Sequence, residues 1–215
     1  MATKTTAGAA AFLPERRTLD DLRGAAASCE GCGLYAPATQ TVFGEGDPHA
    51  RLVFVGEQPG DREDRTGRPF VGPAGQLLRS SLREAGIDER IVYITNAVKH
   101  FSFVERGKRR IHQTPKRIEI RACGPWLENE LAAIRPDLVV ALGSTAASTL
   151  LGTEFRLTKH RGTVVRSPLA ERVVATIHPS AILRTIDEAT RAAEIERFVA
   201  DLRFARETLE AQPAD

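Results

Sequence analysis

The sequence has no apolar run long enough to cross a membrane, and its N-terminus has no hydrophobic signal core. It also has little net charge, because 30 lysines and arginines face 28 acidic residues, so the overall balance predicts no partner. Its glycine-rich loop matches neither the GxxxxGK[ST] phosphate loop nor the GxGxxG dinucleotide pattern. These absences favour a cytoplasmic protein and exclude the two commonest phosphate-binding signatures.

Cysteine is scarce, and an odd total of three argues against a disulfide framework. Cys29 and Cys32 have the CxxC spacing of a chelate, and Cys123 offers a third thiolate. His100 directly follows a predicted strand and is the candidate fourth ligand. The spacing alone fits zinc or an iron–sulfur cluster. It also fits an alternative without a metal, in which two cysteines are free, reduced thiols and the third is a buried core residue.

Short apolar runs alternate with segments of helical periodicity. An apolar fraction of 42% is enough for a core. The predicted strands are 51–56, 91–95, 137–143, 163–167 and 172–179, the last two as an antiparallel pair. Helices are predicted at 18–27, 74–86, 114–134, 144–152 and from about 187 onward. This alternation predicts a three-layer α/β/α fold with a mainly parallel four-stranded sheet, in one domain (16–215) behind a flexible tail (1–15).

In such a sheet, ligands bind beyond the carboxyl ends of the strands. Three segments are predicted there: the loop after Val55, the segment after Thr95, and "HPS" at 178–180. The loop "GEQPGDREDRTGRPFVGPAG" contains Phe70 and several carboxylates in or near it, namely Glu45, Glu57, Asp61, Glu63 and Asp64. Its pattern alone also fits an acidic surface loop with Phe70 packed in the core.

Positive charge is concentrated in one segment. Between Glu105 and Arg121 there are seven lysines and arginines against two acids. The segment fits either a phosphate-binding cluster or a solvated charged face. It contains "GKRRIHQTP", in which three cations precede His112, and Thr114 is predicted to cap a helix with Pro115 at its first position. Pro125 is predicted to bend or divide that helix.

Several motifs occur together in one order: CxxC with a later cysteine, GEQPGxxEDxxGRPFVGPAG, ITNAVK and HPS. This combination resembles the uracil-DNA glycosylase superfamily, especially its iron–sulfur family 4, from about Cys29 to the last helix. Family 4 typically has alanine where Gln58 stands and cysteine where His100 stands, and it lacks the KRRIH insertion. These three departures resemble the branch called UdgX, whose members capture abasic DNA covalently.

The resemblance implies a glycosylase that excises uracil from DNA, preferably single-stranded, and becomes linked through His112 to C1′ of the abasic site. It implies a catalytic set of His112, Glu57, Gln58 and His178. Base contacts would come from Phe70, Asn96 and Gln58. DNA contacts would come from Lys108, Arg109, Arg110 and Ser180. The implied cofactor is a [4Fe-4S] cluster held by Cys29, Cys32, His100 and Cys123.

The chemistry of these residue types suits those roles. An asparagine amide can pair with both N3–H and O4 of uracil, whereas cytosine would leave buried polar atoms unpaired. An attacking imidazole must be neutral, and the cations next to His112 are expected to lower its pKa. The expected product is free uracil, and a monomer in the bacterial cytosol or nucleoid is expected. Two alternatives remain: a conventional multiple-turnover glycosylase using water, and a non-catalytic iron–sulfur or zinc module that binds nucleic acid.

Overall fold

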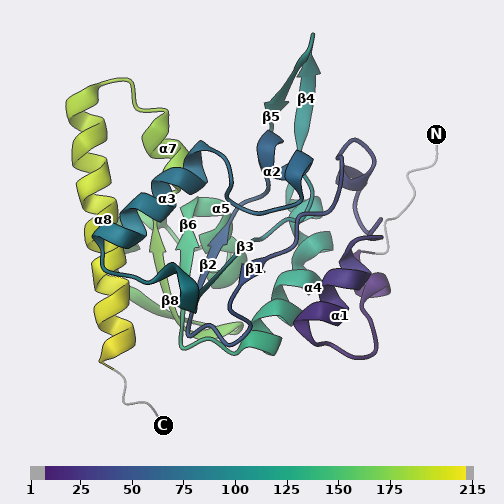
Figure 1. Ribbon diagram of the computed structural model, residues 1–215, viewed down its shortest axis with the longest axis horizontal. Helices are drawn as coiled ribbons and strands as arrows, with labels where there is room; N and C mark the ends of the chain where they lie inside the picture. The colour runs from purple at the N-terminus through teal and green to yellow at the C-terminus, as the bar shows by residue number, and fades with distance from the viewer. Residues whose placement is uncertain (1–7, 212–215) are drawn as a thin grey trace.

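The computed structural model describes residues 8–211 and has three layers (Figure 1). A six-stranded sheet with the order β1-β3-β2-β6-β8-β7 forms the middle layer. Its strands are β1 (Glu45–Gly46), β2 (Leu52–Gly56), β3 (Val92–Asn96), β6 (Leu138–Leu142), β7 (Val164–Ser167) and β8 (Ala170–Thr176). The inner four strands run parallel, and β1 and β7 are antiparallel to their neighbours. The predicted fold class is confirmed, but the sheet has six strands rather than four, because a short antiparallel strand covers each edge.

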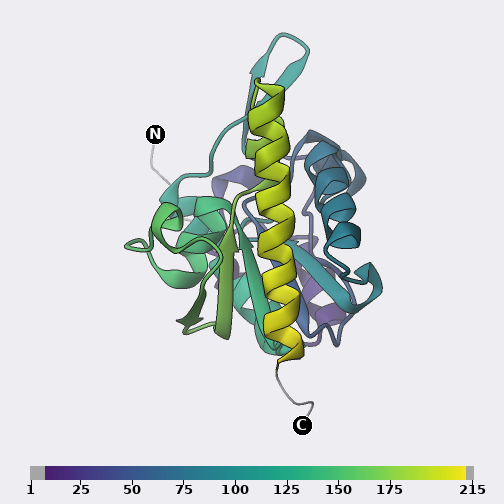
Figure 2. The ribbon, with the colours of Figure 1, turned by 90° about the vertical axis from the view of Figure 1, so that its left-hand side faces the viewer.

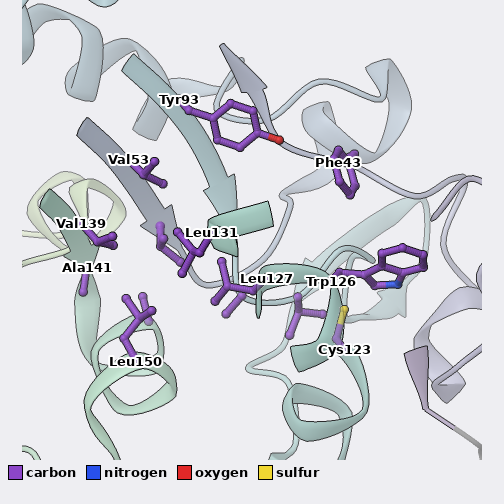
Figure 3. Close-up of a cluster of buried hydrophobic side chains, with 14 of the residues drawn as sticks. Phe43, Val53, Tyr93, Cys123, Trp126, Leu127, Leu131, Val139, Ala141 and Leu150 are labelled. Atoms are coloured by element: carbon purple, nitrogen blue, oxygen red, sulfur yellow. The ribbon is translucent and has the colours of Figure 1, made fainter. Parts of the chain in front are cut away.

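Helices cover both faces of the sheet. On one face lie α1 (Leu19–Ala26), α4 (Arg117–Ile134) and α5 (Gly143–Leu151), on the other α3 (Pro73–Glu84) and the long α8 (Glu188–Glu210), which runs across the sheet in Figure 2. Alternate residues of β2 point to opposite faces, so Val53 joins the first core and Phe54 the second. Figure 3 shows Val53 and Val139 on the same face as Leu127 and Leu131 of α4.

A buried ion pair joins α4 to the sheet. Lys99 and Glu130 have fully buried side chains in contact with each other. Glu130 also accepts hydrogen bonds from Tyr93 Oη and Thr95 Oγ1, and Lys99 Nζ donates to the carbonyl of Asn96. Because both charges are paired and hydrogen-bonded, the pair is tolerated in the interior. It holds the carboxyl end of β3 against α4.

The N-terminal segment is more ordered than predicted. Residues 9–12 form a 3₁₀ helix, η1 (Ala9–Phe12), that contacts α4, and Ala9 is buried. Part of the predicted flexible tail is thus packed on the domain, because small apolar side chains fit against α4. The remainder of that tail, residues 1–7, lies outside the described residues.

Helix α4 differs from its prediction in two ways. Its N-cap is Lys116 rather than Thr114, because the Glu119 carboxylate accepts the Lys116 N–H at 2.7 Å. Pro115 is therefore outside the helix. Pro125 does not divide it, and α4 runs as one helix over 18 residues.

Two elements near the sheet edge were not predicted. Helix α2 (Asp61–Thr66) lies inside the glycine- and proline-rich loop, and strands β4 (Phe103–Arg106) and β5 (Arg109–His112) form a hairpin. The hairpin projects from the body of the molecule (Figure 1). The other short elements are η2 (Gly33–Tyr35), η3 (Glu89–Ile91), α6 (Leu157–His160) and α7 (Pro179–Leu183). Within residues 8–211, every helix is too short or too polar to span a membrane.

Candidate active site

Predicted site residues meet at the carboxyl edge of the parallel strands. Two clefts open there, one of about 580 Å³ containing Glu57 and one of about 380 Å³ containing Phe70 and Asn96. The residues that line both clefts are Gln58, His112, His178, Ser180 and Arg184. The site is therefore a junction of two clefts with His112 and His178 between them.

Phe70 and Asn96 form one wall of the smaller cleft. A side chain at Gly56 would lie 2.4 Å from Asn96 Oδ1 and 2.6 Å from the Phe70 ring, so both groups pack directly on the glycine. Phe70 has φ of 54°, a left-handed conformation rare for an aromatic residue. Asn96 Oδ1 is buried and has no hydrogen-bond partner among the described residues. A ligand N–H placed beside this oxygen would satisfy the unpaired acceptor.

His178 is held in one tautomer by its neighbours. Its Nδ1 accepts a hydrogen bond from the Ser180 backbone N–H at 3.1 Å and lies 2.8 Å from Ser180 Oγ. Arg184 Nη1 donates to the same Oγ at 3.2 Å, so the Ser180 hydroxyl hydrogen is directed at Nδ1. The ring proton must then be on Nε2. Burial, with Arg184 and His112 nearby, lowers the pKa of His178 to about 4, so the imidazole is neutral at pH 7.

The hairpin brings His112 to the junction. Gly107, with φ of 60°, opens its two-residue turn, and Phe103 pairs with His112 at the base. Since side chains alternate along a strand, Arg110 shares the face of His112, whereas Arg109 is on the opposite face. Lys108 and Arg109 are exposed.

Arg110 is held inside the protein rather than offered to DNA as predicted. Its guanidinium donates to Asp61 and Asp64 of α2, the Asp64 contact measuring 2.6 Å, and only 12% of its side chain is exposed. It also lies 4.9 Å from the centre of the Phe103 ring. Asp64 is fully buried and also accepts the Thr39 N–H. Arg110 thus anchors the hairpin to α2.

Gln58 connects β2 to the base of the hairpin. Its Oε1 accepts the Ser102 N–H at 2.9 Å, which fixes the orientation of the amide. Its Nε2 therefore faces the hairpin, donating to the Gln113 carbonyl at 2.9 Å and lying 2.8 Å from His112 Nε2. An amide NH₂ cannot accept a hydrogen bond, so His112 Nε2 must present its lone pair. Gln58 thus favours a neutral His112 with its proton on Nδ1.

Glu57 lies on the other side of His112. Its Oε1 is 3.5 Å from His112 Nε2, and its Oε2 accepts a hydrogen bond from Thr145 Oγ1 of α5. The His112 side chain is half exposed, and its partial burial is the largest cause that lowers its pKa; Glu57 opposes this shift, and Arg184 adds to it. The prediction that adjacent cations keep His112 neutral therefore needs correction, because burial dominates and the cation involved is Arg184.

Three of the predicted cluster ligands, Cys29, Cys32 and Cys123, belong to the buried core that includes α4. Trp126 Nε1 donates to Cys29 Sγ and the Lys99 N–H donates to Cys123 Sγ, each at 3.2 Å. Cys29, Cys32 and Cys123 are all buried, and burial raises the pKa of Cys123 to about 12. A buried thiol of this kind ionises only beside a cation.

His100 is connected to this group through Thr41. Its Nε2 lies 2.9 Å from Thr41 Oγ1, which donates to the Ala26 carbonyl, and the same carbonyl accepts the Cys29 N–H. Its buried Nδ1 has no partner among the described residues. Cysteine thiolates and histidine nitrogens are ligand types that iron–sulfur clusters accept. Within residues 8–211, however, no three or more His, Cys, Asp or Glu side chains form a group that could hold a metal ion.

The sequence-based reasoning missed several site residues. Thr145, Ser102 and Gln113 hold Glu57 and Gln58, and Arg184 contacts Ser180. Ser180, predicted to contact DNA, has its side chain against His178 and Arg184. Thr145 and Arg184 follow a predicted strand and the HPS segment closely, which is the only sequence signal that marks them.

Comparison with known proteins gives concordant matches. Residues 43–203 match the family model described as the uracil DNA glycosylase superfamily. A type-4 uracil-DNA glycosylase of Thermotoga maritima is 42% identical over 80% of this chain and 83% of its own length. A type-4 enzyme of Archaeoglobus fulgidus is 39% identical over 77% and 83% respectively. A type-5 uracil-DNA glycosylase of Pyrobaculum aerophilum is 37% identical over 63% of each chain.

Proposed function

Because this chain belongs to the uracil-DNA glycosylase superfamily, we propose that it excises uracil from DNA and then captures the abasic site on His112. The names of its relatives support the glycosylase reaction. The capture step is supported by one observation above all: Gln58 and Glu57 both contact the His112 ring where the two clefts meet.

The smaller cleft has the groups needed to recognise uracil. The unpaired Asn96 Oδ1 can accept N3–H, and the amide nitrogen can then donate to O4. The Phe70 ring, 5.9 Å from the ring of His178 between centroids, offers a face on which an extruded base can stack. Cytosine presents a lone pair at N3 and a donor at C4, so it would leave polar atoms unpaired at a cost of about 1–3 kcal/mol each.

His178 would stabilise the departing base. With Ser180 holding Nδ1, the Nε2–H of the neutral ring is free to donate to a uracil oxygen. Negative charge develops on that oxygen as the C1′–N1 bond breaks, so the hydrogen bond is stronger in the transition state than in the ground state. The Glu57 carboxylate, oriented by Thr145, would offset the positive charge that develops on the sugar.

In the capture step, the electron pair of the C1′–N1 bond leaves with uracil, whose anion is later protonated by solvent. The His112 Nε2 lone pair leaves the Gln58 amide and forms the bond to C1′. The resulting imidazolium loses its Nδ1 proton to solvent and becomes a neutral N-glycosyl imidazole. Because that group leaves poorly, turnover stops after one uracil.

The cofactor in this proposal is a [4Fe-4S] cluster held by Cys29, Cys32, His100 and Cys123. Its thiolate and imidazole bonds would join the N-terminal segment, the end of β3 and α4. The exposed Lys108 and Arg109 would contact DNA phosphates, with single-stranded DNA preferred. Free uracil is the product of the proposed reaction, and the protein would act as a monomer in the bacterial cytosol or nucleoid.

Incubation with a uracil-containing single-stranded oligonucleotide, followed by denaturing electrophoresis, tests this proposal. We expect a slow-migrating band that resists SDS and heat in the unsubstituted protein. His112→Ala should lose the band but still release uracil, because water can attack C1′. A covalent band that persists in His112→Ala would exclude His112 as the nucleophile. Uracil release without any band would indicate a multiple-turnover enzyme, and neither product would indicate a binding module.

A further inference from the structure

Arg184 is an exposed cation at the junction of the two clefts. It follows α7 directly, lines both clefts, and donates through Nη1 to Ser180 Oγ at 3.2 Å. Among residues 8–211, no carboxylate lies within ion-pair distance of its guanidinium. Its charge acts on both histidines, lowering the pKa of His112 and of His178. A cation at this position, with no carboxylate beside it, is available to bind an anionic group of a ligand.

Two arginines of the hairpin do not supply a free cation beside His112. Arg110 is already paired with Asp61 and Asp64, and Arg109 is on the hairpin face opposite to His112. A nucleotide whose base enters the smaller cleft and whose C1′ reaches His112 must place its own phosphates at the rim. Arg184 lies on that rim, next to both His112 and His178.

We propose that Arg184 binds the DNA phosphate next to the extruded uridine and, through Ser180, positions His178 against the departing base. The inference rests on the proposed glycosylase function. Arginine suits this double role, because its planar guanidinium can donate to Ser180 with one nitrogen and to phosphate oxygens with the others. Phosphate binding and orientation of His178 then depend on one side chain.

Binding is measured first, separately from catalysis. The probe is a single-stranded oligonucleotide with a tetrahydrofuran abasic analogue, which has no base to release. Arg184→Ala should bind it about tenfold more weakly at low salt, and the plot of log affinity against log salt should be less steep by about 0.7. The control is Arg166→Ala in β7. Position 166 lies beside the start of β8, whereas His178 follows the end of β8, so this arginine is at the opposite end of the sheet from the site. Its affinity and slope should match those of the unsubstituted protein.

Two further variants separate the phosphate contact from the positioning role. Ser180→Ala should keep the salt slope but slow single-turnover uracil release at saturating DNA, because His178 Nδ1 loses its hydroxyl donor. Arg184→Lys should keep the salt slope of the unsubstituted protein. Its rate of uracil release should lie between those of Arg184→Ala and the unsubstituted protein, since an ammonium lacks the planar fork of a guanidinium. An unchanged release rate in Ser180→Ala would overturn the positioning role.

A methylphosphonate on either side of the uridine removes the charge of one phosphate and identifies the contact. At one of the two positions it should weaken binding by the unsubstituted protein but have no further effect on Arg184→Ala. Independent, additive losses at both positions would overturn the proposal. If the protein releases no uracil but the tetrahydrofuran probe still shows the predicted slopes, the proposed function fails while the phosphate contact stands.

Discussion

At the scale of single residues, the state of His112 depends on the orientation of one amide. The Ser102 N–H fixes Gln58 Oε1, which leaves the Gln58 NH₂ group facing His112 Nε2. A neutral imidazole can accept that hydrogen bond, whereas an imidazolium would place two donors against each other. Gln58 and burial therefore act in the same direction and keep the candidate nucleophile unprotonated.

This arrangement predicts how capture depends on pH. Since the pKa of His112 is lowered from its usual 6.5, more than half of the rings are neutral at pH 6.5, and the neutral fraction rises further at higher pH. The ratio of adduct to released uracil should be constant from about pH 7.5 upward and fall as the solution becomes more acidic. Single-turnover assays at fixed ionic strength measure the ratio. A ratio that rises on acidification would contradict a neutral nucleophile.

Thr145 offers a second test at the residue scale. Its hydroxyl donates to Glu57 Oε2, and Thr145→Val removes that donor with little change in shape. A hydrogen bond to a charged group contributes about 1.5–3 kcal/mol, so single-turnover uracil release should slow by about tenfold or more. Thr145→Ser retains the hydroxyl and is the control. Equal rates in the two variants would show that the Glu57 contact does not matter to the reaction.

At the scale of elements, the hairpin that carries His112 depends on α2. Replacing Arg110 with methionine leaves the buried Asp64 without its cation, which should destabilise the protein by about 3 kcal/mol. The loosened hairpin should also lower adduct yield more than uracil release, because only capture needs His112. Urea denaturation and denaturing gels measure the two effects.

Arg109→Met is the matched control for that experiment. Arg109 is adjacent in sequence but lies on the opposite, exposed face of β5. We expect a change in unfolding free energy of only about 0.5 kcal/mol or less, as for most surface substitutions. If Arg109→Met and Arg110→Met reduce the adduct yield to the same extent, the positive charge of the hairpin, rather than its attachment to α2, determines capture.

The elements that sequence reasoning missed share a physical cause. Helix α2 is flanked by Gly60 and Gly67, which read as loop residues, although Glu63 accepts the Gly60 N–H and Gly67 ends the helix with φ of 72°. The β4–β5 hairpin turns at Gly107 and Lys108, without the asparagine–glycine or aspartate–glycine signal typical of two-residue turns. Both elements depend on contacts outside their own sequence.

At the scale of the whole molecule, the proposed cluster would join segments that are distant along the chain. His100→Ala removes the unpaired Nδ1, so we expect loss of iron, weaker visible absorbance and a lower melting temperature. His100→Cys should retain iron, because a thiolate replaces the imidazole. Iron analysis, absorbance and thermal denaturation measure these outcomes. Full iron content in His100→Ala would require a different fourth ligand.

Local patterns in the sequence determined most of the fold. Apolar runs predicted the strands of the parallel core, and helical spacing predicted α1, α3 and α8, the last of which begins after its N-cap Asp187, close to the predicted start. These features depend on neighbours a few residues apart, so the sequence contains them directly. The order of motifs likewise placed Glu57, Asn96 and His178 at one edge of the sheet.

Only the tertiary structure decided what each side chain does there. Gln58 meets His112 across 54 positions of sequence, and Arg110 meets Asp61 across 49. Charge and spacing could not show that Arg110 pairs with Asp61 and Asp64, while Arg184, at the cleft, has no carboxylate partner within residues 8–211. Such roles depend on burial and on the direction of individual donors and acceptors, and packing sets both only when distant segments come together.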